Sequence, residues 1–124
     1  MKKLFIALLT LLALSCPAFA ADWYWIGQLN NGIQYYIDNS SVEKNAEKAI
    51  IWCKYVNTDG SYAVIRWAFI RKGRLFTLLS ASTYDKNGNY ISGDDVPLNS
   101  YALQWTSITP DTSIESLYYS IWPY

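Results

Sequence analysis

The sequence has no histidine among its 124 residues, and that absence excludes several kinds of active site. Without an imidazole the chain has no Ser-His-Asp triad, no Cys-His nucleophile pair and no His-ligated zinc centre. Most acidic side chains occupy turn or cap positions where hydrogen bonds to the backbone explain them. Examples are Asp59, Asp85, Asp111 and Glu115. We therefore expect a protein that is not an enzyme.

The chain also lacks an excess of positive charge. Ten Lys and Arg balance ten Asp and Glu, only 16% of the residues are charged, and the isoelectric point is near 6.1. Binding to DNA or RNA depends on a cationic surface that neutralises phosphates. We therefore expect no nucleic-acid partner. A hydrophobic fraction of 52% is typical of a globular chain and not of a disordered one.

One acidic turn starts like a calcium-binding loop, with Asp-Lys-Asn-Gly-Asn at residues 85–89. The sixth position of such a loop requires Gly and is Tyr90 here, and the twelfth requires Glu and is Val96. The segment therefore predicts a hairpin turn. We expect no metal ion and no other cofactor.

Long apolar runs are absent except at the start of the chain. Lys2 and Lys3 precede an apolar run at residues 4–14, and Ala-Phe-Ala follows at residues 18–20. This order is typical of a secretory signal peptide, and the run is shorter than the roughly 20 residues that span a bilayer. We expect a signal peptide at 1–20, one domain at 21–124, and no transmembrane segment after cleavage. The location would be periplasmic, outer-membrane-associated or at the cell surface.

Cysteine is scarce, with one residue in the expected signal peptide and one after it. An alternative to simple cleavage is acylation of Cys16, although the preceding Ala-Leu-Ser fits a lipobox poorly and Pro17 follows directly. The expected domain keeps Cys53 alone, so it has no internal disulfide and must be stabilised by packing. We interpret Cys53 as a small buried residue.

Four glycine-containing pairs, at residues 31–32, 59–60, 72–73 and 87–88, mark turns between segments rich in aromatic and β-branched residues. This pattern predicts an antiparallel meander of about six strands. The expected strands are 23–29, 33–38, 48–57, 61–70, 74–84 and 90–92, with a further extended piece at 102–107.

A helix is expected near the end of the chain. Thr112 and Glu115 have the spacing of a capping box, apolar residues then recur at helical spacing, and Pro123 ends the pattern. The recurring residues are Ile114, Leu117, Tyr118 and Ile121. The expected fold is α+β, a single antiparallel sheet with a C-terminal helix packed on one face.

Aromatic residues are abundant, and nineteen Phe, Trp and Tyr residues follow residue 20. One helix covers too little of a sheet to bury them all, so part of them should form an open face or a self-association surface. Alternation along two neighbouring strands indicates which residues lie on that face. The candidate partner-binding residues are Trp52, Lys54, Tyr62, Val64 and Arg66.

Several short motifs occur in the order seen in a known family. They are Tyr-Tyr-Ile-Asp at 35–38 with Ser-Ser-Val at 40–42, Ile-Trp at 51–52, Arg-Leu-Phe-Thr-Leu-Leu-Ser at 74–80, Tyr-Asp at 84–85 with Gly88, and Trp105, Ile108, Pro110, Ser113 and Leu117. Taken together, they resemble the surface-adhesin protein E family of small exported bacterial proteins. The resemblance implies a single antiparallel sheet with a C-terminal helix, and a function in binding host extracellular proteins.

The resemblance also implies a feature that this chain lacks. Many members of that family have a disulfide between the C-terminal helix and the sheet, and the corresponding positions here are Arg71 and the Trp122-Pro123 end. We expect aromatic packing to replace that bond.

The sequence favours two functions over a third, which is a small-ligand carrier or an enzyme. The first is an exported, non-enzymatic binding protein of the adhesin E type, which docks a protein partner through an aromatic sheet face. Its partners would be extracellular host proteins or a second copy of itself. The alternative is a structural or envelope-assembly domain in the periplasm with no host ligand.

Overall fold

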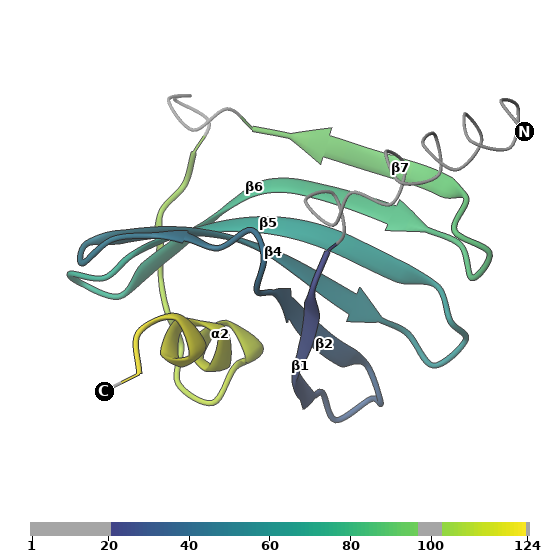
Figure 1. Ribbon diagram of the computed structural model, residues 1–124, viewed down its shortest axis with the longest axis horizontal. Coiled ribbons are helices and arrows are strands. Elements are labelled where there is room, and N and C mark those ends of the chain that lie inside the picture. Colours follow the sequence, from purple (N-terminus) through teal and green to yellow (C-terminus); the bar gives the residue numbers. More distant parts are fainter. Residues whose placement is uncertain (1–20, 97–102, 124) are drawn as a thin grey trace, which may run out of the picture.

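The computed structural model describes residues 21–96 and 103–123, so the expected signal peptide at 1–20 lies outside the described residues. The described part forms an eight-stranded antiparallel sheet followed by one helix (Figure 1). Its elements are β1 (Trp23–Gln28), β2 (Gln34–Asp38), β3 (Glu43–Lys44), β4 (Lys48–Val56), β5 (Tyr62–Ile70), β6 (Leu75–Tyr84), β7 (Tyr90–Asp95), β8 (Thr106–Ser107) and α2 (Ser113–Ile121). The predicted α+β fold is confirmed.

The six longer strands follow the order β1-β2-β4-β5-β6-β7, which is the predicted meander. The two-residue strands β3 and β8 extend it. Strands β2 and β3 pair with different parts of the same edge of β4, and the chain leaves the sheet between them at residues 39–42. Strands β7 and β8 share an edge of β6 in the same way. Strand β8 is the end of the extended piece expected at 102–107, of which residue 102 lies outside the described residues.

The segment that starts like a calcium loop is a hairpin turn, as predicted. The Asp85 carboxylate accepts hydrogen bonds from the backbone N–H groups of Asn87 and Asn89, at 2.9 Å each. Gly88 has a φ of 85°, a conformation that is strained for residues with a side chain. The carboxylate is therefore used to build the turn between β6 and β7.

The core lies between one face of the sheet and α2, which is below the sheet in Figure 1. Three of the four predicted helix residues are buried, and Ile114 is partly buried. The buried cluster consists of Tyr35, Ile37, Ala49, Ile51, Cys53, Phe69, Ile108, Leu117, Tyr118, Ile121 and Trp122. These side chains come from the three strands β2, β4 and β5, the segment after β8, and the helix with its C-cap, so one apolar cluster joins both layers.

Both ends of α2 are fixed by polar contacts. At the first turn, the Thr112 hydroxyl accepts a hydrogen bond from the Glu115 N–H at 3.3 Å, as the capping box predicts. The Glu115 carboxylate accepts from the Asp111 N–H at 3.2 Å. At the last turn, the Lys44 ammonium donates to the Ile121 carbonyl oxygen at 2.7 Å. A cation at a helix C-terminus also interacts favourably with the helix dipole.

The hairpin between β5 and β6 holds the helix through arginines. The Arg71 guanidinium lies 5.7 Å from the centre of the Trp122 ring. Arg74 forms a 2.8 Å ion pair with Glu115, and its guanidinium lies 5.3 Å from the ring centres of Tyr118 and Tyr119. At the positions where the resemblance implies a disulfide, this chain therefore has a contact between a cation and an aromatic ring.

Residues 21–96 and 103–123 include no helix with the length and hydropathy needed to cross a bilayer.

Candidate surface on the outer sheet face

The five candidate residues come together on one face of the sheet. Trp52 and Lys54 belong to β4, and the other three belong to β5. Trp52 is paired with Arg66 across the two strands, Lys54 is paired with Val64, and Tyr62 follows at the next position on the same face. We call the set Trp52, Lys54, Tyr62, Val64 and Arg66 the outer patch.

The outer patch faces away from α2. The residues of β4 that alternate with the outer patch, Ile51 and Cys53, are fully buried in the core between the sheet and α2. Successive side chains of a strand point to opposite faces of the sheet. The five side chains of the outer patch are each partly exposed. The sequence therefore predicted the two faces of the central strands correctly.

Each cation of the outer patch lies against an aromatic ring. The Lys54 ammonium is 4.4 Å from the centre of the Tyr62 ring and 5.7 Å from that of Trp23 in β1. The Arg66 guanidinium is 5.7 Å from the centre of the Trp52 ring. Such contacts contribute about 0.5–1 kcal/mol each at exposed sites. They hold the long cationic side chains along the sheet, so the patch presents aromatic surface and positive charge together.

Tyrosines extend the aromatic surface toward β7. The Tyr62 ring stacks on Tyr84 at a centroid distance of 5.0 Å, and Tyr84 contacts Tyr90 edge-on at 5.9 Å. Tyr84 and Tyr90 are not among the five residues predicted from the sequence for this surface. The hairpin turn at 87–88 carries the signal that would have found them, because its register places Tyr90 opposite Tyr84.

A second extension lies toward β1. Trp25 is paired with Tyr36 of β2, which in turn is paired with Lys54, so all three lie on the outer face. The Trp25 ring donates a hydrogen bond from its Nε1 to the Gln34 side chain at 2.6 Å and remains 53% exposed. A β-bulge at Ile26 shifts the register of β1, so the residues before and after it do not follow one alternation.

Two titratable side chains of β4, Cys53 and Tyr55, contribute to the packing of the core. Burial raises the pKa of the Cys53 thiol to about 12, so the thiol stays protonated and unreactive at neutral pH. Burial also raises the pKa of Tyr55, whose hydroxyl lies 3.1 Å from the Ser113 hydroxyl at the start of α2. The interpretation of Cys53 as a small buried residue is confirmed. Within residues 21–96 and 103–123, no group of three His, Cys, Asp or Glu residues could hold a metal ion.

Comparisons of this chain with protein-family models, with curated proteins and with solved structures give no match.

Proposed function

We propose that this protein is an exported, non-enzymatic binding protein of the surface-adhesin E type, which docks a protein partner through the outer patch. The observation that carries the proposal is the position of the five residues on adjacent central strands, on the face opposite the helix. An antiparallel sheet can leave one face to solvent, and here that face carries tryptophan, tyrosine and arginine beside each other.

The composition of the patch supports a protein as the partner. Trp, Tyr and Arg are enriched at the centres of protein interfaces, where they supply most of the binding energy. Here they are preordered by their contacts with one another, which lowers the entropy lost on binding. The two cations, Lys54 and Arg66, favour a partner surface that is acidic around an apolar centre.

The chemistry of the remaining groups supports a non-enzymatic function. The thiol of Cys53 is buried and has a raised pKa, which is the opposite of what a nucleophile needs. The Asp85 carboxylate is bound within a turn, and that of Glu115 is bound by Arg74 and the Asp111 N–H.

Binding assays with single substitutions test the proposal. The chain from residue 21 onward is titrated onto immobilised extracellular-matrix proteins, and its self-association is followed by light scattering. Trp52→Ala and Arg66→Ala should each weaken binding by about 30-fold, or about 2 kcal/mol, if they lie at the centre of the interface. Trp105→Ala is the matched control, because Trp105 is a partly exposed tryptophan outside the patch.

Two results would favour the alternative function. If the wild-type chain is monomeric and binds none of the matrix proteins, the adhesin proposal is wrong. Protease treatment of whole cells that leaves the protein intact would agree with a periplasmic structural or envelope-assembly domain. Release of the protein by that treatment would support a location at the cell surface.

A further inference from the structure

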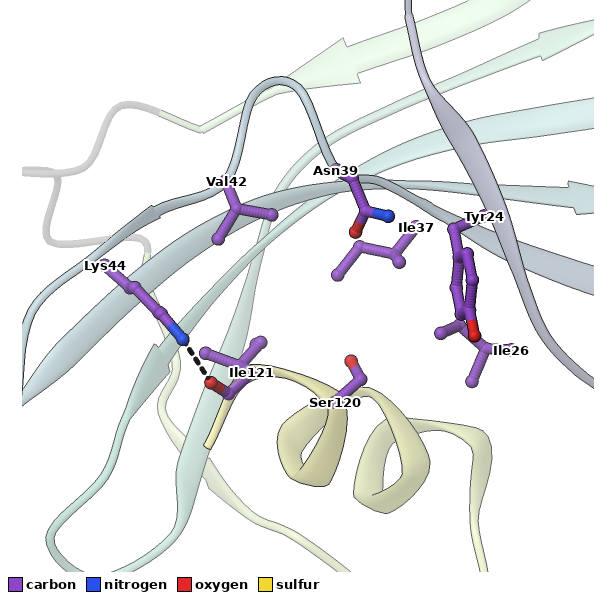
Figure 2. Close-up of a pocket in the computed structure, with 8 residues that line it drawn as sticks. All are labelled: Tyr24, Ile26, Ile37, Asn39, Val42, Lys44, Ser120 and Ile121. Atoms are coloured by element: carbon purple, nitrogen blue, oxygen red, sulfur yellow. Dashed lines mark hydrogen bonds between the residues drawn. The ribbon is translucent and has the colours of Figure 1, made fainter. Parts of the chain in front are cut away.

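A pocket of about 320 Å³ lies on the helix side of the sheet, separate from the outer patch. It is bounded by β1, by the chain between β2 and β3, and by the last turn of α2 (Figure 2). The eight lining residues are Tyr24, Ile26, Ile37, Asn39, Val42, Lys44, Ser120 and Ile121. Its volume is at the lower end of the range of about 300–1,000 Å³ that small-molecule sites occupy.

The pocket has apolar walls and a polar side. Ile26, Ile37, Val42 and Ile121 supply aliphatic surface, and Ile37 and Ile121 are themselves part of the buried core. Figure 2 shows the Asn39 amide and the Ser120 hydroxyl pointing into the space between these walls. A few polar groups converging on an apolar pocket is the usual composition of a ligand site.

The polar side contains a cation, Lys44, for which residues 21–96 and 103–123 supply one hydrogen-bond acceptor. The Lys44 ammonium donates to the Ile121 carbonyl oxygen at 2.7 Å. An ammonium group has three donors, so it can still donate to a ligand. The Ser120 hydroxyl donates to the Leu117 carbonyl oxygen at 2.6 Å and is left as an acceptor. Lys44 is the one basic residue among the eight that line the pocket.

The acids nearest in sequence do not neutralise this charge within the pocket. Glu43 directly precedes Lys44, but it is paired with Ile50 on the outer face, whereas Lys44 is paired with Ala49 of the core. Asp38 lies between two lining residues, but it alternates with Ile37 and belongs to the other face of β2. Its carboxylate is bound by the hydroxyls of Ser40 and Ser41 and by the Asp22 N–H. The eight lining residues thus combine one positive charge with no negative charge.

From this geometry we propose that the pocket binds a carboxylate attached to a short apolar body. The carboxylate accepts charge-assisted hydrogen bonds from the Lys44 ammonium, and the Asn39 amide supplies a further donor. The apolar body lies against the four aliphatic side chains. This chemistry is shared by free carboxylic acids of medium chain length and by the C-terminal carboxylate of a peptide that ends in an aliphatic residue.

The site is independent of the proposed adhesin function. None of its lining residues belongs to the outer patch, and the two lie on opposite faces of the sheet. Loss of binding at one surface should leave the other unchanged, so the two proposals can fail separately.

Titration with matched acids and neutral analogues tests the proposal without any substitution. Hexanoate and hexanamide are compared by calorimetry and by chemical-shift mapping of the wild-type chain, and so are an N-acetylated peptide ending in Gly-Leu and its C-terminal amide. At least one acid should bind about tenfold more tightly than its amide, with shifts at Ile37, Val42 and Ser120. Whichever acid binds more tightly, hexanoate or the peptide, identifies whether the carboxylate comes from a free acid or from a peptide C-terminus.

Substitutions then test the role of each part of the pocket. Lys44→Met should lower the affinity for the acid to that of its amide, whereas Lys48→Met should have no effect because Lys48 lies on the outer face. Val42→Trp fills the pocket and should abolish binding of the acid and of its amide. Thermal unfolding of each variant shows whether α2 remains docked.

Three outcomes would overturn the proposal. The first is equal affinity for acids and amides in the wild-type chain, which needs no variant and so does not depend on folding. The second is the absence of any binding at about 10 mM of either acid. The third is a set of chemical-shift changes that maps outside the lining residues.

Discussion

The Asp38 carboxylate holds several parts of the chain together where the chain leaves the sheet after β2. It accepts hydrogen bonds from the Asp22 N–H at 2.8 Å, from the hydroxyls of Ser40 and Ser41 at 2.7 Å each, and from the Ser40 N–H at 3.1 Å. Burial alone would raise the pKa of Asp38, but these hydrogen bonds outweigh it and lower the pKa below its ordinary value. The residue therefore connects the start of β1 to the end of β2 in its ionised form.

Asp38→Asn should destabilise the fold by about 1–3 kcal/mol at pH 7, since an amide cannot accept all of these hydrogen bonds. The pKa of Asp38 is lower in the folded state than in the unfolded state, so its contribution is complete above the unfolded pKa. The contribution is lost as the pH falls through the folded pKa. Urea unfolding of both proteins at several pH values measures this. The difference between them should shrink below about pH 4, and a difference independent of pH would contradict the assignment.

Cys53 should be inert in the native protein. Its thiol is buried and its pKa is raised to about 12, so thiolate is scarce even at pH 8. A thiol reagent added to the native chain from residue 21 onward should react no faster than the chain unfolds, and should react at once in urea. Cys53→Ala should keep the fold and show a small loss of stability from the cavity. A disulfide-linked dimer as the main species would be incompatible with this prediction.

At the scale of the element, α2 depends on one leucine more than on its caps. Leu117 is fully buried beneath the sheet, and a nine-residue helix is too short to be stable alone. Leu117→Ala should therefore lower the free energy of unfolding by about 2–5 kcal/mol. Leu78→Ala is the matched control, because Leu78 is 40% exposed and should lose much less. Urea titration compares the two, and equal losses would mean that the helix is not held by its buried side.

The arginine contacts of α2 can be tested in the same way. Arg71→Met keeps the apolar stem and removes the charge over the Trp122 ring. The expected loss is about 0.5–2 kcal/mol, the range for contacts between cations and aromatic rings. Thermal unfolding of Arg71→Met should show the loss, while Lys72→Met in the same turn should behave as the wild type. If the two variants are equally stable, the Trp122 contact does not help to hold the helix.

Most elements could be predicted because their signals are local. Glycine pairs mark the turns, alternation separates the faces of β4 and β5, and Thr112 with Glu115 marks the start of α2. The short strands β3 and β8 could not be found, since two residues show no alternation, and the pairing of β8 with β6 also joins residues far apart in sequence. Likewise, the ion pair of Glu115 with Arg74 depends on how the β5–β6 hairpin packs on the helix.

At the scale of the whole molecule, the outer patch was predictable and the pocket was not. The patch lies on two adjacent strands joined by a hairpin, so its register follows from one turn. The pocket needs Tyr24, Lys44 and Ile121, which come from three parts of the chain and meet only when the sheet and helix have packed. No pattern within a single segment of the sequence predicts that these three residues lie close together.

The position of α2 at the end of the chain also has a consequence for the order of folding. Every pairing of the long strands joins neighbours in sequence, whereas Lys44 and Ile121 are separated by 77 positions. Local hairpins form early, and contacts of long sequence separation form late. During refolding the sheet should thus exist briefly with its helix-binding face open to solvent. A dye that fluoresces on apolar surface should brighten and then dim as α2 docks, and this interval is when the chain is most prone to aggregate.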